Sequence, residues 1–102
     1  MRMMLSVTFP TAKFNELSRA GQLGATLKQI LEDIKPEAAY FGKENKGQRG
    51  AIIIVDVASP TDISRVTEPW YLALDAQVET SVCMLPAEVA QIDMAGLAEK
   101  YG

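Results

Sequence analysis

The sequence predicts a small α+β domain in which a four-stranded antiparallel sheet carries two helices on one face. The first observation is the most apolar run of the chain, residues 51–57, which is rich in β-branched side chains and follows a polar, glycine-containing turn. The second is the alternation of apolar and polar residues near both ends of the chain, which is typical of strands. The third is the helical spacing of apolar residues in two intervening stretches.

Composition places the chain among ordinary globular proteins. Its 102 residues are expected to form one domain, 1–102, with 48% apolar and 23% charged residues and a net charge of -3. We therefore expect no nucleic-acid partner, and no run is long enough to span a membrane, which predicts a cytoplasmic location. The single cysteine and the absence of histidine argue against a disulfide, a metal site and the usual general base, so no cofactor is expected.

Two elements are predicted in the first third of the chain. Residues 2–9 alternate between apolar and more polar side chains, which indicates a strand, and Pro10 ends it. Thr11 is a suitable cap for a helix over residues 11–34, whose apolar positions keep a spacing of three and four. Gly21 and Gly24 interrupt this helix, so it either bends there or packs closely on another element. Pro36 closes it.

A β-hairpin is predicted next. An extended segment, residues 37–42, leads through a turn over residues 43–50 into the strand at residues 51–57. Because this last strand is a short and continuous apolar run, we expect both of its faces to be buried.

The second half adds one helix, one strand and a tail. Ser59, Pro60 and Asp62 form a strong helix-start signal. Pro69 is expected to stop or kink this helix, with a short turn restarting over residues 70–74. Residues 78–85 alternate as a strand, and residues 86–101 are expected to form a helical tail.

The predicted order β-α-β-β-α-β plus a tail is the split βαβ, or ferredoxin-like, arrangement. Two helices cover only one face of such a sheet, while the apolar strand at residues 51–57 requires cover on both. The simplest cover is a second copy of the chain related by a two-fold axis. We therefore expect a homodimer that is held together through the sheet face.

Three segments carry a family resemblance: KPEAAYF (residues 35–41), GQRGAIIIVDV (residues 47–57) and the EPW that follows the second helix start (residues 68–70). With them the chain resembles, over nearly its full length, the dimeric α+β barrel superfamily, and within it a group of small, mostly uncharacterised bacterial proteins. The resemblance implies two ferredoxin-like chains that press their sheets into a shared barrel. The superfamily includes cofactor-free monooxygenases, isomerases, haem proteins and plain ligand-binding proteins. Many of them use a histidine, which this chain lacks.

Two charged residues are candidates for a site between such sheets. Asp56 shares a strand face with Ile52 and Ile54, so it either lines the cavity with a raised pKa or lies paired and solvated at the rim. Arg49, beside Lys43, Lys46 and one acid, Glu44, is placed at the mouth of the cavity to hold a carboxylate or phosphate, or else belongs to a solvated hairpin tip.

The remaining candidates are aromatic or lie on the last strand. Tyr40 and Phe41 alternate, so one ring faces the helices and Tyr40 either lines the cavity or packs at the interface. Trp70 either walls a pocket or belongs to the core. Glu79 shares a strand face with Ser81 and Cys83, and that face lines the cavity or meets solvent. A reactive Cys83 would need a nearby cation or base, and the sequence offers none.

Three functions fit this sequence. The first is a homodimer that binds a small organic ligand through Tyr40, Arg49, Asp56, Trp70 and Glu79. The second is a cofactor-free isomerase or monooxygenase acting on an acidic or phenolic molecule, with Asp56 or Glu79 as the proton acceptor. The third is an interaction module without a ligand, whose second sheet face is covered by its partner. The identity of a ligand does not follow from the sequence.

Overall fold

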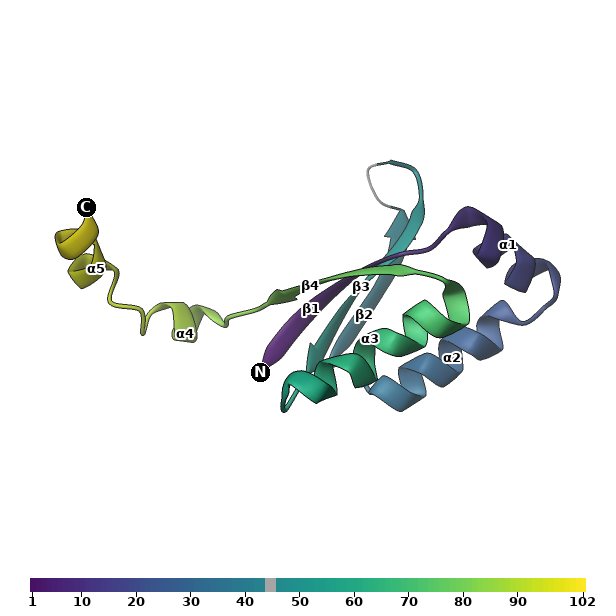
Figure 1. The fold of residues 1–102 in the computed structure, drawn as a ribbon, viewed down its shortest axis with the longest axis horizontal. Coiled ribbons are helices and arrows are strands. Elements are labelled where there is room, and N and C mark those ends of the chain that lie inside the picture. The colour runs from purple at the N-terminus through teal and green to yellow at the C-terminus, as the bar shows by residue number, and fades with distance from the viewer. Residues whose placement is uncertain (44–45) are drawn as a thin grey trace.

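The structure, a computed structural model, describes residues 1–43 and 46–102 and confirms the predicted four-stranded antiparallel sheet (Figure 1). The strands are β1 (Arg2–Thr8), β2 (Ala38–Lys43), β3 (Arg49–Asp56) and β4 (Gln77–Val82). The helices are α1 (Thr11–Arg19), α2 (Leu23–Ile34), α3 (Pro60–Leu74), α4 (Pro86–Val89) and α5 (Met94–Tyr101). Helices α1, α2 and α3 lie on one side of the sheet, while α4 and α5 extend away from it.

The strand order in the sheet is β2-β3-β1-β4. Strand β3 therefore lies between β1 and β2, and β1 lies between β3 and β4, so each helical connection crosses over one intervening strand. The two central strands pair along their whole length, with Leu5 opposite Ile53. Strands β2 and β4 form the edges of the sheet.

The core lies between the sheet and helices α1, α2 and α3. Alternate residues of β1 and β3 point toward the helices, and Leu5, Ile53 and Val55 are almost completely buried there. The helices contribute one apolar stripe each, as their spacing predicts. The helical side chains in this core are Phe14, Leu17, Leu23, Leu27, Ile30, Leu31, Ile34, Ile63, Val66, Trp70, Ala73 and Leu74.

The predicted helix over residues 11–34 is two helices. The chain leaves α1 after Arg19 and enters α2 at Leu23, with Gly21 at a backbone φ of +70° between them. Only glycine adopts this left-handed conformation without strain, so the helix is interrupted at Gly21. A Cβ atom at Gly21 or Gly24 would meet nothing within 4 Å, which rules out the predicted alternative of close packing on another element. The prediction that Thr11 caps the helix was wrong, because Pro10 occupies the cap position and offers no side-chain hydrogen bond.

Helix α3 passes through Pro69 without ending, so the predicted stop or restart was wrong. Its start is as predicted: Ser59 caps the helix by accepting a hydrogen bond from the backbone of Asp62 (3.4 Å), and Pro60 is its first residue. The buried stripe formed by Val66, Trp70 and Leu74 continues across Pro69. Packing of this stripe outweighs the roughly 3 kcal/mol by which an internal proline disfavours a helix.

One face of the sheet carries no helix in a single chain, and we call it the open face. The apolar strand β3 is buried on its helix side, but Ile52 on the open face is 38% exposed. One chain alone therefore leaves this face of β3 uncovered, and its expected burial by a second copy stays a prediction. Apolar side chains also reach the open face from β1 and β2, where Met4 is half-buried and Tyr40 is exposed.

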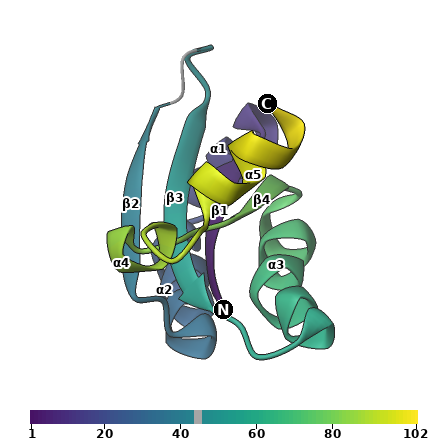
Figure 2. The same cartoon turned by 90° about the vertical axis from the view of Figure 1, so that its left-hand side faces the viewer.

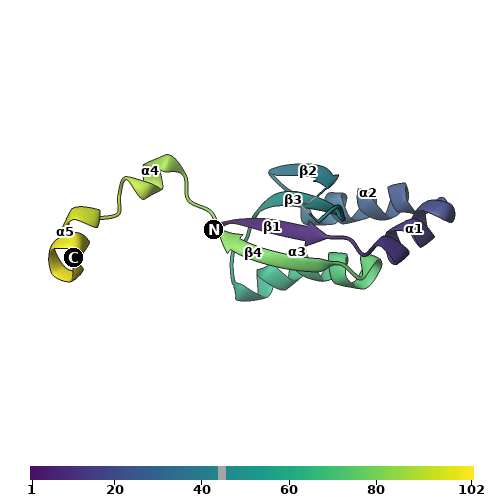
Figure 3. The same ribbon diagram turned by 90° about the horizontal axis from the view of Figure 1, so that it is seen from above.

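The predicted helical tail is present as α4 and α5, and it does not fold back onto the sheet. Figures 1 and 3 show residues 83–102 running outward from the end of β4. Figure 2 looks along the molecule from that side and shows α5 in front of the domain. Both helices leave all their residues outside the core.

Candidate functional site

The open face is best described as rows of residues that pair across the strands. One row holds Tyr40, Ile52, Ser6 and Glu79 in that order, from β2 through β3 and β1 to β4. The row on one side of it holds Ala38, Ile54, Met4 and Ser81, and the row on the other side holds Gly42, Gly50, Thr8 and Gln77. The centre of this face is thus apolar, with hydroxyl groups and one carboxylate along its β1 and β4 side.

A hollow of about 220 Å³ lies in this region, over strands β1, β2 and β3. Tyr40 and Ile52 line it with apolar surface, and Ser6 contributes a hydroxyl group. The complete lining is Ser6, Val7, Tyr40, Phe41, Gly42, Lys43, Gly50, Ala51 and Ile52.

Two facing glycines create the hollow. Gly42 on β2 and Gly50 on β3 pair directly, so the position beside Tyr40 and Ile52 has no side chain on either strand. A Cβ atom at Gly42 would meet nothing within 4 Å, whereas one at Gly50 would lie 2.8 Å from the carbonyl oxygen of Val7. Gly50 is therefore required by the close approach of β1 to β3, and the absence of a side chain at Gly42 leaves space that a ligand can fill.

Tyr40 and Glu79 lie at opposite ends of the same row. Tyr40 is on the open face with 69% of its surface exposed, and Phe41 is on the helix side, where its ring stacks on Phe9 with centroids 6.3 Å apart. This confirms that the two rings point to opposite faces. Glu79 pairs across the sheet with Ser6 and is exposed, so its face is the open one.

Asp56 lies at the rim of the open face, at the opposite end of β3 from the hollow. Its Oδ1 accepts a hydrogen bond from the amino group of Met1 at 2.8 Å. This contact, with a smaller contribution from Arg2, lowers the pKa of Asp56. Of the two predicted alternatives, the structure therefore shows the paired and solvated position at the rim and not the cavity carboxylate with a raised pKa. The geometry gives no support to Asp56 as a proton acceptor.

Arg49 lies on the helix side of the sheet and not at the mouth of the hollow. Its guanidinium group donates a hydrogen bond to Asn15 at 2.8 Å and lies over the ring of Phe14, 4.4 Å from the centroid. These contacts hold the end of β3 against α1. The predicted position was wrong because neighbouring side chains of a strand point to opposite faces. Arg49 directly precedes Gly50, which is on the open face, so the Arg49 side chain points to the helix side. Glu44, the acid of this turn, lies outside the described residues.

Trp70 belongs to the core and does not wall the hollow. It is fully buried on the helix side of the sheet, and its ring centroid lies 6.0 Å from that of Phe9. Cys83 is half-buried just after β4, where its backbone N–H donates to the carbonyl of Arg2 at 3.0 Å. Of the five predicted site residues, the structure brings Tyr40 into the hollow and places Glu79 in the same row.

Sequence reasoning missed Gly42, Gly50 and Lys43 as lining residues. The signal was present in the hairpin, because two glycines at matching distances from a turn can face each other and leave a gap. Finding it required the register of the hairpin, since a slip of one residue would have moved Tyr40 to the helix side.

No family model matches the chain, and no curated protein matches it significantly. Within the described ranges, no three acidic, cysteine or histidine side chains come together as a metal site. No helix in the same ranges combines the length and apolar character needed to cross a membrane.

Proposed function

We propose that the protein is a homodimer that binds a small organic molecule between two facing sheets. In this arrangement each chain is one ferredoxin-like half of an α+β barrel, and the open face of one copy covers the open face of the other. The observation that carries the proposal is the hollow beside the paired glycines, which lies on the only face of the sheet that no described helix covers.

The dimer is supported by the apolar centre of the open face. Met4, Ile52 and Ile54 belong to the two central strands, and Ile52 remains 38% exposed in one chain. Faces of antiparallel sheets that meet water usually carry polar residues, and an apolar one is typical of an interface. A second sheet would remove these side chains from water and contribute about 25 cal/mol for each Å² of apolar surface buried.

The size of the hollow also favours two copies. At about 220 Å³ it is smaller than the roughly 300–1,000 Å³ of sites that bury most of a small ligand. A facing copy would close this hollow from above and add its own lining. The site would then be complete only in the dimer.

The lining favours a flat aromatic molecule as the ligand class. The phenol ring of Tyr40 and the side chain of Ile52 offer apolar surface, and Ser6 offers a hydroxyl group for hydrogen bonding. A flat ring with a substituent that can hydrogen-bond to Ser6 satisfies these features together.

Filling the hollow tests this proposal. Gly42→Val is expected to fold normally, because nothing lies within 4 Å of the new Cβ and valine favours strands. Binding of 4-hydroxybenzoate, followed by amide chemical shifts in ¹H–¹⁵N spectra, should shift residues around Ser6 and Ile52 in the wild type. In Gly42→Val we expect binding to weaken by roughly tenfold or more, or about 1.4 kcal/mol.

The control is Thr80→Val, which places an extra apolar group on the helix side of the same sheet, opposite Leu5. It should bind 4-hydroxybenzoate like the wild type. Equal binding by Gly42→Val and the wild type would show that the hollow is not the site.

A further inference from the structure

We propose that residues 83–102, which we call the arm, pack on the body of a second copy, against Tyr40 and Phe41 and the cations of its hairpin. The proposal rests on the homodimer of the proposed function and not on its ligand. It assigns an interaction surface to a segment that packs on no other element of its own chain among the described residues.

The arm extends far from its own domain. The chain measures 59 × 30 × 19 Å, and its radius of gyration of 17.0 Å exceeds the roughly 13 Å expected for a compact domain of this length. Figure 3 shows that the arm accounts for this elongation. The hydrogen bond from Cys83 to Arg2 marks the end of its pairing with the sheet.

The arm carries two apolar stripes at helical spacing. Leu85, Val89 and Ile92 are separated by four and three residues, and Met94, Leu97 and Tyr101 by three and four. All six are exposed, by 37% to 76% of their surface. Such stripes in a globular protein normally pack against another element.

The two arm helices are also too short to be stable alone. Helix α4 has 4 residues and α5 has 8, while isolated helices shorter than about 12–15 residues are marginal in water. The Asp93 carboxylate caps α5 by accepting from the backbone of Gly96 at 3.0 Å, which fixes its start but does not bury its apolar side. Because α4 and α5 are helical in spite of their short length, we infer that another surface packs against them.

The exposed area of the chain is large enough for a stable dimer. The chain exposes 6964 Å², about 1,300 Å² more than a folded monomer of its mass is expected to expose. A standard protein interface covers about 800 Å² on each partner. The excess is thus of the size that contact with a second copy would remove.

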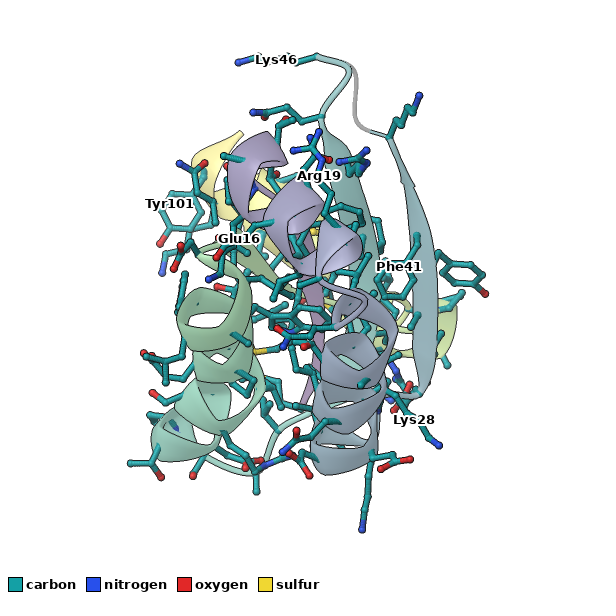
Figure 4. All side chains as sticks on the ribbon, turned by 90° about the vertical axis from the view of Figure 1, so that its right-hand side faces the viewer. Glu16, Arg19, Lys28, Phe41, Lys46 and Tyr101 are labelled. Atoms are coloured by element: carbon teal, nitrogen blue, oxygen red, sulfur yellow. The ribbon has the colours of Figure 1, made fainter. Side chains whose placement is uncertain are left out.

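Charge points to the hairpin as the surface that receives the arm. The arm holds Glu88, Asp93 and Glu99 against one cation, Lys100. The hairpin carries Lys43, Lys46 and Arg49, and Figure 4 shows Lys46 projecting at its tip. Opposite charges of this kind steer two surfaces together and fix their orientation.

The apolar and geometric requirements agree with this choice. Tyr40 and Phe41, which are 69% and 47% exposed, lie on opposite faces of the edge strand β2, and they offer apolar surface to the arm stripes on both sides of this edge. The arm leaves the sheet at the end where Arg2 pairs with Asp56, which is the opposite end from the hairpin. If a two-fold axis makes the strands of the two facing sheets run in opposite directions, the hairpin of one copy lies at the same end as the arm of the other.

Cross-linking of isotope-mixed chains tests directly whether the arm of one copy contacts the hairpin of the other. Full-length chains with ¹⁴N and ¹⁵N are unfolded together, refolded and treated with a carbodiimide, which joins carboxylates to amines that touch. We expect Glu88, Asp93 or Glu99 to link to Lys43 or Lys46, with mixed-isotope pairs as frequent as same-isotope pairs. A dimer without such links would overturn the arm proposal alone. So would a dimer in which every link joins two segments of the same isotope, because the arm would then contact its own chain. A monomer would overturn the homodimer as well.

A pair of variants gives a second, independent readout. Leu97→Asp in the arm and Leu72→Asp on α3 both place a charge on a side chain that is exposed in one chain, so neither should unfold the domain. Leu97→Asp is expected to raise the dissociation constant of the dimer roughly tenfold or more, because its carboxylate would be buried against the partner. Leu72→Asp should leave it unchanged. Equal dissociation constants for the two variants would contradict the proposal.

Discussion

Trp70→Ala is expected to lower the free energy of unfolding by about 3–5 kcal/mol, more than any other single truncation in this chain. The indole ring is completely buried between α3 and the sheet and packs against Phe9. Replacing it with a methyl group leaves a large cavity that the surrounding helices and strands fill only in part. A domain of this size is stable by about 5–15 kcal/mol, so much of that margin would be lost.

Urea unfolding followed by far-UV circular dichroism measures this effect, because the variant lacks the only tryptophan for fluorescence. Leu72→Ala on the same helix is the control, and its 79% exposure predicts a change within about 0.5 kcal/mol. Trp70→Phe should lose less than Trp70→Ala. It keeps an aromatic ring and removes an indole N–H that has no acceptor among the described residues. A stable Trp70→Ala variant would place Trp70 outside the core.

Gly50→Ala is expected to destabilise the domain by about 1–3 kcal/mol. The added methyl carbon would lie 2.8 Å from the carbonyl oxygen of Val7, which is closer than such atoms approach in proteins. Because the contact is with backbone, the two central strands must separate locally to relieve it. That shift would weaken the longest strand pairing of the sheet.

Gly42→Ala is the matched control, because Gly42 pairs with Gly50 and a Cβ there has open space around it. We expect Gly42→Ala to be as stable as the wild type or slightly more so, since alanine restricts the unfolded chain. Thermal unfolding of the two variants side by side separates the steric effect from the general effect of removing a glycine. Equal melting temperatures would mean that β1 and β3 do not approach as closely as described.

The sheet was predictable from the sequence because strands with strong alternation or β-branched runs leave few alternatives. Strand β3 follows from its run of β-branched residues, and the start of α3 follows from Ser59 and Pro60. Local signals failed at Pro69, where the buried stripe of α3 overrides the propensity of one residue. They also could not choose between a bend and close packing at Gly21 and Gly24, because that depends on how α1 and α2 pack.

The site was harder to predict than the fold, since it depends on register. Arg49 and Gly50 are adjacent in the sequence, yet one lies on the helix side against Phe14 and the other beside the hollow. The pKa of Asp56 depends on the amino group of Met1, which is 55 residues away along the chain. Neither relation is visible in a local pattern.

Native mass spectrometry of the freshly purified full-length chain tests the central claim, that two copies face each other through their sheets. We expect a species of twice the 11.1 kDa mass of one chain. An additional small mass carried by this dimer would support the enclosed ligand site. Variant Ile52→Lys, which places a charge at the centre of the open face, should shift the spectrum toward the single chain. A wild-type protein that remains a single chain at micromolar concentration would contradict the account.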